Sequence, residues 1–481
     1  MKHMKQKLLA LGSALALTAS LAGPAMAAEA DAGISVQLDG QNVAFTDVKP
    51  EAHSGRTFLP FRAVFEAMGA QVDYKADTQT ILADRDGTHL EMTLGSKDVK
   101  ITENGESRTV TMDVAPYAKS NRTYVPVRFA AEAFGCNVGW DQDDQTVIIA
   151  DVDKLMGGAT YELMDNYCAY AAKQAAQSSQ AVKGDLSMKL TVSKEATGTE
   201  KDMSIPVTAT LSGISSQTAG QLKMTMDLSG IMDMMTAEDT GLTPAEFAAM
   251  KAQLKQVTAE IRMDLETGMY YINCPVLAQL MGNENGDKVW FSMDFNALLA
   301  SSGIDLSELV AMSKGASGSM KDVLASTLSA IPLTDKDTDY TALSAVAKVY
   351  SDMLSDQAFV KNGSTYTSTF SMKEDGADMT MKLVLTAKGE DIVGMKMDMS
   401  MKAAGTDPDP SASAAAGRSS ISMDMSMSSA VDKMTMTLDM DLMDLITLTM
   451  EMNMTSSATS DKPVTTLPAN AVVVPLDGVL K

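Results

Sequence analysis

The chain has 481 residues, in which 62 acidic residues outnumber 39 lysines and arginines to give a formal net charge of −23 at pH 7. That length allows two or three domains and ample core volume. An acidic surface repels phosphate backbones and anionic lipid headgroups, which argues against nucleic acid as a partner.

The first 27 residues have the order of a secretory signal peptide. A basic start precedes an apolar run over residues 8–21, and the small-residue pattern Ala25-Met26-Ala27 follows. The run is shorter than the ~20 residues that cross a bilayer, so cleavage after Ala27 is predicted. Cleavage removes three lysines and no acidic residue, which changes the net charge from −23 to −26. No later segment is apolar enough to span a membrane. Together with the predicted signal peptide, this leads us to expect a secreted or cell-envelope-associated protein.

Residues 34–152 contain an internal repeat with a constant offset of 66 residues. The sequence GRTFLPFR at 55–62 corresponds to NRTYVPVR at 121–128, and the matches continue without a gap to 79–81 and 145–147. Such a register indicates a duplicated unit. The repeated positions with a structural role are Arg56, Pro60, Arg62, Glu66, Gly69, Arg122, Pro126, Arg128, Glu132 and Gly135.

Each copy has the pattern strand, helix, strand. A proline favours the start of the helix, Val64, Phe65 and Met68 share one apolar face, and the glycine at 69 supplies a left-handed stop. The arginine four residues before each glutamate has two interpretations. It is either a repeated binding residue or half of an Arg–Glu pair along the helix, and the second is favoured.

The pattern R-T-x-[LV]-P-x-R followed by E-A-x-G-x-x-V-x-[WY] occurs in both copies and resembles the copper amine oxidase N-terminal domain family. The resemblance implies a small antiparallel sheet wrapped around a helix in each copy. It does not imply copper or oxidation, because the family is named after a stalk domain remote from the amine oxidase active site. Members on bacterial surface proteins look like attachment or spacer modules, so a cell-envelope component is the expected partner.

The composition changes after residue 153. Helical spacing predicts a helix over about 160–182, the capping box TPAE at 243–246 opens another, and a further cap stands at 305–308. A last helix is predicted over 339–354. Strands with strict alternation lie before and after these helices, and residues 403–420, rich in Ala, Ser, Pro and Gly, predict a flexible loop.

Methionine dominates the alternating strands between residues 379 and 454, where the intervening residues are almost all polar. A period of two places the methionines on one face of a sheet and the polar side chains on the other. The order of elements and the ending P-V-x-x-x-L-P resemble the half-barrel of periplasmic lipoprotein carriers and Gram-positive surface lipoproteins, although the lipid-attachment cysteine is absent.

We therefore predict an α+β fold. A duplicated small β-sheet-plus-helix module over 34–152 is followed over 159–481 by an antiparallel half-barrel with helices on its concave face. The three cysteines, Cys136, Cys168 and Cys274, are too few for a disulfide framework. We expect them to be small buried residues, and a Cys168–Cys274 bond stays open.

Three interpretations of the methionines compete. They fill a core, they line a surface that adapts to an apolar or lipid ligand, or their thioethers bind copper(I). Core filling ranks first, the apolar-ligand face close behind, and copper a distant third because strand alternation already explains M-x-M. The predicted lining of an enclosed apolar cavity is Met224, Met226, Met263, Met381, Met397, Met399, Met425 and Met436.

No motif of a nucleophile, catalytic metal or phosphate loop occurs, and the predicted mature chain has only the histidines His53 and His89. No catalytic residue, metal or cofactor is therefore expected. We therefore predict an exported, non-catalytic cell-envelope protein. Its N-terminal module serves for surface attachment or as a spacer, and its C-terminal domain binds or senses an apolar ligand. The alternatives are a purely structural surface protein and a thioether copper(I)-binding protein.

Overall fold

A computed structural model describes residues 33–476, apart from positions 54, 104, 199, 284, 297–305, 307–309, 311–318, 375–376, 405–419 and 431. The predicted signal peptide, most of the cap at 305–308 and most of the loop at 403–420 lie outside the described residues. The fold is mixed α+β and mostly strands. Two compact units divide the chain: unit 1 is Met1–Ala159 with Lys321–Ser351, and unit 2 is Thr160–Met320 with Asp352–Lys481.

Unit 1 contains three sheets within its described residues. Their strand orders are β10-β11-β4-β3, β5-β6-β7-β8-β9 and β12-β13-β1-β2. The strands are β1 (Ser35–Leu38), β2 (Gln41–Asn42), β3 (Glu51–His53), β4 (Arg56–Pro60), β5 (Gln71–Lys75), β6 (Thr80–Arg85), β7 (Thr88–Thr93), β8 (Asp98–Glu103), β9 (Glu106–Thr111), β10 (Tyr117–Lys119), β11 (Arg122–Pro126), β12 (Cys136–Asp141) and β13 (Thr146–Asp151). Most neighbours are antiparallel, but β1 pairs with β13 in parallel, which the purely antiparallel expectation missed.

Strand pairing in unit 1 is reciprocal between positions 66 residues apart. β4 and β11 lie antiparallel with Leu59 opposite Val125, which is its counterpart in the sequence repeat. Two ion pairs follow the same rule, since Arg56 contacts Asp113 and Arg122 contacts Asp47. Each arginine thus reaches the carboxylate of the other copy.

The core of unit 1 is closed. The short helices α2 (Phe61–Ala67) and α3 (Val127–Glu132) pack with the sheets in one buried cluster that includes Leu59, Phe65 and Val125. Val64, Phe65 and Met68 are buried, as the helical spacing predicts. Each repeat proline occupies the N-cap position, one residue earlier than the predicted first helical turn.

The segment Lys321–Ser351 packs on the edge strand β12 of unit 1. The side-chain amide of Asn137 donates to the carbonyl oxygens of Leu328 and Ile331 at 3.0 and 2.7 Å. The backbone N–H of Trp140 donates to the carbonyl oxygen of Leu333 at 3.0 Å. A Cβ on Gly139 would lie 2.0 Å from that same Leu333 oxygen, so only glycine fits. These contacts explain why this segment belongs with unit 1.

From the sequence, that segment is predicted to belong to the C-terminal domain over 159–481. Its helices are α12 (Met320–Ser329) and α13 (Asp339–Leu354), the second with the bounds predicted from the sequence. The apolar spacing of this helix predicts a stripe of Leu343, Val346, Ala347, Tyr350 and Leu354, of which the first four are buried and Leu354 is half-buried. Helical spacing identifies the buried face of a helix but not the element that covers it, which is why the partner was missed.

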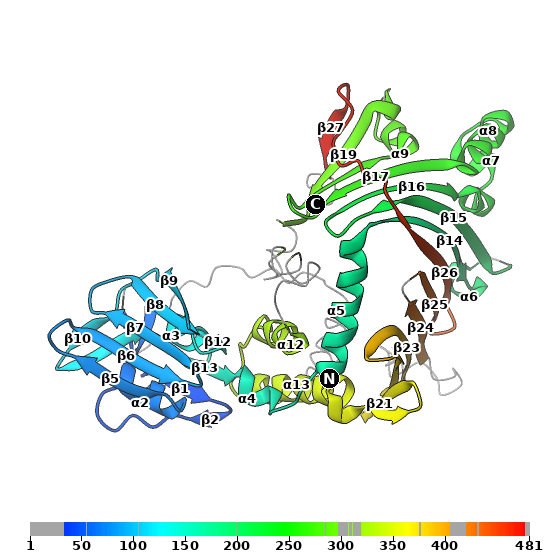
Figure 1. Cartoon of the computed structure of the whole chain (residues 1–481). Coiled ribbons are helices and arrows are strands. Elements are labelled where there is room, and N and C mark those ends of the chain that lie inside the picture. Colours follow the sequence, from blue (N-terminus) through cyan, green and yellow to red (C-terminus); the bar gives the residue numbers. More distant parts are fainter. Residues whose placement is uncertain are drawn as a thin grey trace. The chain divides into compact units, whose positions relative to one another are not determined.

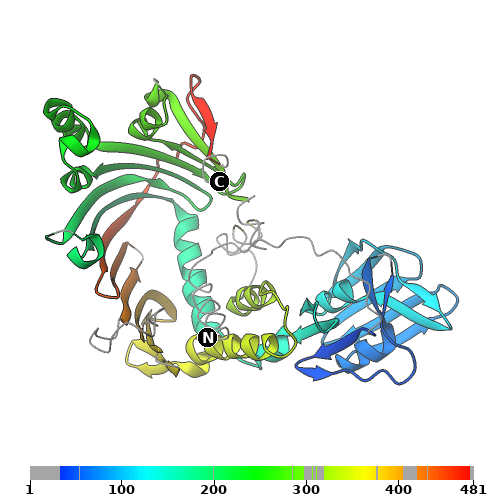
Figure 2. The same ribbon diagram turned by 180° about the vertical axis from the view of Figure 1, so that it is seen from behind.

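Unit 2 is built on one large sheet that curls into a half-barrel (Figures 1 and 2). Its order is β20-β21-β22-β23-β24-β25-β26-β14-β15-β16-β17-β18-β19-β27. The strands are β14 (Ser179–Val192), β15 (Met203–Ser215), β16 (Ala219–Asp227), β17 (Val257–Asp264), β18 (Met269–Asn273), β19 (Val289–Asp294), β20 (Val360–Asn362), β21 (Thr365–Glu374), β22 (Ala377–Lys388), β23 (Asp391–Ala404), β24 (Ser420–Ala430), β25 (Lys433–Leu442), β26 (Ile446–Thr459) and β27 (Val472–Pro475). Among these described strands, only β19 and β27 pair in parallel.

Helix α5 (Glu162–Gln177) crosses unit 2 and packs against strands that include β14, β22 and β23. Asp356 caps it, because its carboxylate accepts the backbone N–H groups of Glu162 and Leu163, both at 2.9 Å. The helix ends five residues before the predicted 182, since the chain becomes extended at Ser178 and enters β14. The shorter α8 (Pro244–Leu254) has the predicted capping box, formed by Thr243 and Glu246.

Across the described stretches, no helix has the length and apolar character that crossing a bilayer requires. All three cysteines are free thiols, so Cys168 and Cys274 do not form a disulfide. Cys136 and Cys274 are buried as expected, but Cys168 is exposed on α5. Burial raises the pKa of Cys136 to about 12, which makes that thiol unreactive near neutral pH.

Candidate functional site

The methionines of unit 2 form continuous rows across its sheet. Residues directly opposite one another in neighbouring strands point to the same side. One row runs from β22 to β17 through Leu383, Met397, Met427, Met436, Met452, Leu186, Ala209, Met226 and Val257. A parallel row runs through Met381, Met399, Met425, Leu438, Met450, Met188 and Val207. We call the side of the sheet that carries these two rows the methionine face.

All eight methionines predicted from the sequence lie on this face. Six of them belong to the two rows. Met224 is paired with Leu211 and Ala259 two residues before Met226 on β16, and therefore lies on the same side as Met226. Met263 lies on β17 at the same alternation phase as Val257. The period of two therefore identified the side correctly, and strand pairing brings the eight residues together.

Helix α5 covers one end of the methionine face. Its Met164 belongs to a buried cluster with Leu383, Leu385 and Ile392 of β22 and β23, and Leu163 and Tyr167 pack against it. On the same two strands, Met381 and Met399 are only 5% and 6% exposed. Here the methionines act as ordinary core residues.

The middle of the face is more open. Along the first row, Leu383 is buried at one end and Ala209 and Val257 at the other, whereas every residue from Met397 to Leu186 is only half-buried. On β24, β25 and β26 no described methionine is fully buried. The result is a partly open apolar surface with closed ends, where sequence analysis predicted an enclosed cavity.

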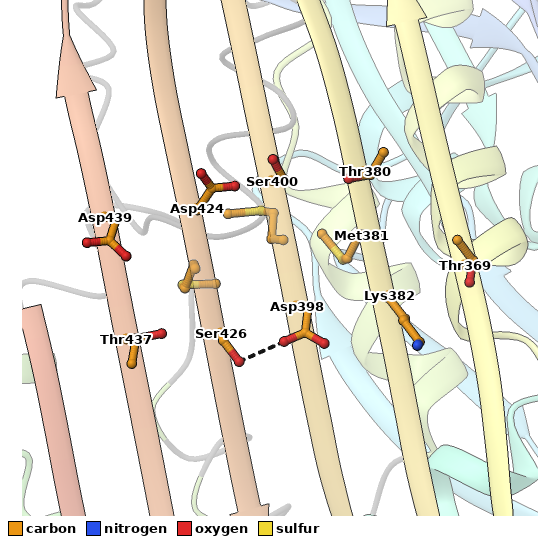
Figure 3. A pocket seen from close by; sticks show the side chains of 12 residues that line it. Thr369, Thr380, Met381, Lys382, Asp398, Ser400, Asp424, Ser426, Thr437 and Asp439 are labelled. Carbon is orange, nitrogen blue, oxygen red and sulfur yellow. Dashed lines mark hydrogen bonds between the residues drawn. The ribbon is translucent and has the colours of Figure 1, made fainter. Parts of the chain in front are cut away.

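The polar face of the same strands is also hollowed (Figure 3). A depression of about 390 Å³ crosses β21 to β25 and is bordered by two polar rows. These rows are Thr369, Lys382, Asp398, Ser426 and Thr437, and Thr380, Ser400, Asp424 and Asp439. Three methionines of the opposite face, Met381, Met399 and Met425, contribute to its floor.

The charge balance of this depression is acidic, with three aspartates against Lys382. Burial acts to raise the pKa of Asp398, but hydrogen bonds from Ser426 at 2.7 Å and Lys396 at 2.9 Å outweigh it, so the pKa lies below its usual range. Asp398 is therefore ionised at neutral pH and solvated on the polar side. This arrangement suits a water-facing surface.

The repeat-motif residues of unit 1 occupy structural positions. Arg62 lies 3.2 Å from Glu66 and Arg128 lies 3.9 Å from Glu132, both exposed pairs along a helix. Such pairs contribute little to stability. Arg56 and Arg122 join the two copies, and the glycines at 69 and 135 have positive φ of 85° and 71°. The architectural interpretation of these positions, favoured from the sequence, accounts for each of them.

The residues that hold the segment Lys321–Ser351 were not predicted from the sequence. Asn137 and Gly139 stand where the first copy has Gln71 and Asp73, which are exposed. The difference in sequence between the two copies at these positions was therefore the signal that could have identified the residues. It marks a face that is covered in one copy and solvated in the other.

Among the described residues, no group of three or more His, Cys, Asp or Glu side chains could hold a metal ion. Residues 37–149 match the family described as the copper amine oxidase N-terminal domain. The resemblance drawn from the repeat is thus confirmed for the N-terminal region, and the match indicates a non-catalytic N-terminal domain. A comparison with curated proteins found no match to this chain.

Proposed function

We propose that this is an exported, non-catalytic cell-envelope protein that holds an apolar ligand on the methionine face of unit 2. The observation that carries the proposal is the open middle of the first methionine row. Five neighbouring strands, β23 to β26 and β14, present half-buried apolar side chains there in unbroken register. At ~4.8 Å between strands the open section is roughly 19 Å long.

Two physical arguments favour a ligand over a plain core. A core residue is shielded on all sides, as Phe65 and Val125 are in unit 1, at 1% and 0% exposed. A contiguous apolar surface that stays partly open typically marks an interaction site. Methionine also suits such a site, because its unbranched thioether chain re-packs around varied shapes. We further propose that the half-barrel carries its helices on its concave side, which makes the methionine face the inner one.

For unit 1 we propose attachment or spacing at the cell envelope. We infer that residues 34–152 are two copies of one module, and the reciprocal pairing of Leu59 with Val125 and of the arginines supports this. Export is inferred from the basic start, the short apolar run and the pattern A-M-A. No residue of unit 1 is assigned a catalytic role.

The test compares matched variants on the two sides of the same strands. Met436 and Met452 are paired on the methionine face, and the adjacent Thr437 and Glu451 are paired on the polar face. Changing Met436→Gln and Met452→Gln keeps side-chain size but adds polar groups where the ligand would lie. Changing Thr437→Gln and Glu451→Gln places the same groups on the wet side.

An environment-sensitive lipophilic dye is titrated into the mature full-length protein, with long-chain lipid as competitor. We expect dye binding that lipid displaces, a loss of affinity of about tenfold or more in the methionine-face variant, and little change in the control, since polar groups in an apolar site are costly to desolvate. Absence of binding, or equal losses in both variants, would overturn the proposal and favour a purely structural role.

A further inference from the structure

The methionines of this protein differ in solvent exposure, from a buried class through a half-buried class to a few that are exposed. Those in the core of unit 1, such as Met92 and Met156, are 1% exposed, and Met381 on β22 and Met399 on β23 are nearly as well shielded. The nine methionines of β24, β25 and β26, the three central strands of the methionine face, all belong to the half-buried class: Met423, Met425, Met427, Met434, Met436, Met440, Met450, Met452 and Met454. Both classes are chemically identical thioethers, so only access separates them.

A thioether reacts with hydrogen peroxide by oxygen-atom transfer. A sulfur lone pair attacks one peroxide oxygen, the O–O bond breaks, and the departing hydroxide takes the remaining proton to leave as water. Sulfur is oxidised by two electrons and the peroxide is reduced. The product, methionine sulfoxide, is polar, and its formation depends on access of the oxidant to sulfur.

We propose that the open part of the methionine face is an oxidation site, which peroxide modifies before the shielded methionines and which thereby loses its affinity for apolar ligands. The second half of this inference rests on the proposed function. Because methionines of neighbouring strands lie opposite one another, their oxidation products add up along the row. Met436 lies between Met427 and Met452 in the sheet, so sulfoxides at successive positions place polar oxygens along the row.

The sheet itself is expected to survive this reaction. Each strand of this region is held on both sides by backbone pairing, for example β25 between β24 and β26. Because the side chains are already half-exposed, a sulfoxide oxygen there can reach water without leaving a buried polar group unpaired. A sulfoxide oxygen at Met381 or Met399 could not reach water in this way, since both residues are buried. The chemistry therefore changes the surface of the open region without requiring it to unfold.

Exposed methionines elsewhere provide a control. Met235, Met250, Met281 and Met443 are 37–38% exposed and stand outside the strands of the methionine face. They will also be oxidised, but they are not part of the rows. A variant with these four changed to leucine should therefore respond to peroxide as the natural protein does. A variant with Met427→Leu, Met436→Leu and Met452→Leu removes reactive sulfur from the first row at little cost in packing.

The experiment treats the mature full-length protein with hydrogen peroxide for increasing times and measures sulfoxide at each methionine by peptide mass spectrometry. Dye binding and far-ultraviolet circular dichroism are recorded in parallel. We expect the half-buried class to oxidise at least about fivefold faster than the buried class. As the half-buried methionines are oxidised, dye binding should fall while the circular dichroism stays constant. Treatment with methionine sulfoxide reductase should restore dye binding. Under peroxide, the row variant should keep more of its dye binding than the four-site control.

Equal oxidation rates in the two classes would overturn the oxidation site. Equal loss of dye binding in the row variant and the natural protein would overturn its coupling to ligand affinity. If untreated protein binds no dye, the proposed function and this coupling fail together, while the sulfoxide map still decides whether the oxidation site exists.

Discussion

The core of unit 1 and the methionine face of unit 2 start from the same local pattern and end differently. In unit 1, Val99 and Ile101 alternate with the exposed Asp98 and Lys100 and belong to the closed core, where they are 0% and 2% exposed. In unit 2, Met427 and Met436 alternate as regularly but remain half-buried. Alternation determines which side of a strand is apolar, and the next layer of structure determines whether that side becomes a core or a surface.

The largest expected effect concerns what the two apolar regions contribute to folding. Phe65→Ala should lower the free energy of unfolding of unit 1 by about 3–5 kcal/mol, because it leaves a cavity in a closed core. Met436→Ala should lower that of unit 2 by only roughly 1 kcal/mol, since less apolar area leaves water on folding. Denaturant unfolding of the full-length protein, followed by probes in each unit, measures both. Similar losses would remove the distinction between core and face.

A second comparison is between the two copies in unit 1. Gly139→Val should destabilise the packing of Lys321–Ser351 by about 1–3 kcal/mol, because a Cβ there collides with the Leu333 carbonyl. Asp73→Val at the matched position of the first copy is the control, since Asp73 is exposed. Limited proteolysis should cut the segment faster only in the first variant. Equal cutting in both would mean that β12 does not anchor the segment.

The same segment should respond to acid. Asp141 is 5% exposed, and although burial acts to raise its pKa, backbone N–H groups of Lys336, Asp144 and Asp143 hold that pKa below its usual range. A carboxyl whose pKa is lower in the folded state stabilises it above the unfolded pKa of about 3.9, and this contribution is lost as the pH falls through the folded value.

Release of the segment should therefore increase as the pH falls below about 4. Asp141→Asn should weaken its attachment at pH 7 and flatten this part of the pH profile. Hydrogen exchange of residues 321–351 between pH 3 and 7 gives the measurement. An unchanged profile in the variant would show that Asp141 is not the titrating group.

The smallest expected effect is with copper(I). Thioethers that alternate along a strand are accounted for by the sheet, and the described residues include no cluster of other metal-binding side chains. We expect no stoichiometric copper(I) binding in competition with a chelator. Tight sites that vanish when Met397, Met399, Met425 and Met427 become leucine would replace the apolar-ligand account with a metal-binding one.

Local signals in the sequence predicted much of this fold. The 66-residue register located both short helices of unit 1, and the bounds of α13 and the capping box of α8 follow from side-chain spacing. What could not be predicted depends on partners distant in the sequence. The packing of Leu333 on β12 and the parallel pairing of β1 with β13 have no local signature.

The candidate site divides in the same way. Period two placed all eight predicted methionines on one side of the sheet, because side-chain direction is a local property of a strand. Which of them are shielded depends on the elements that pack on the sheet, and the sequence does not encode that packing in any short motif. Met399 is buried and Met425, directly opposite it on the next strand, is not, although both occupy the same M-x-M pattern.

The most direct test of the central claim is native mass spectrometry of the protein extracted from its own envelope under mild conditions. The account predicts a population heavier than the polypeptide by the mass of an apolar molecule, and a marked loss of that population in the Met436→Gln and Met452→Gln variant but not in the Thr437→Gln and Glu451→Gln control. A protein that carries only its polypeptide mass, or an adduct equally abundant in both variants, would contradict it.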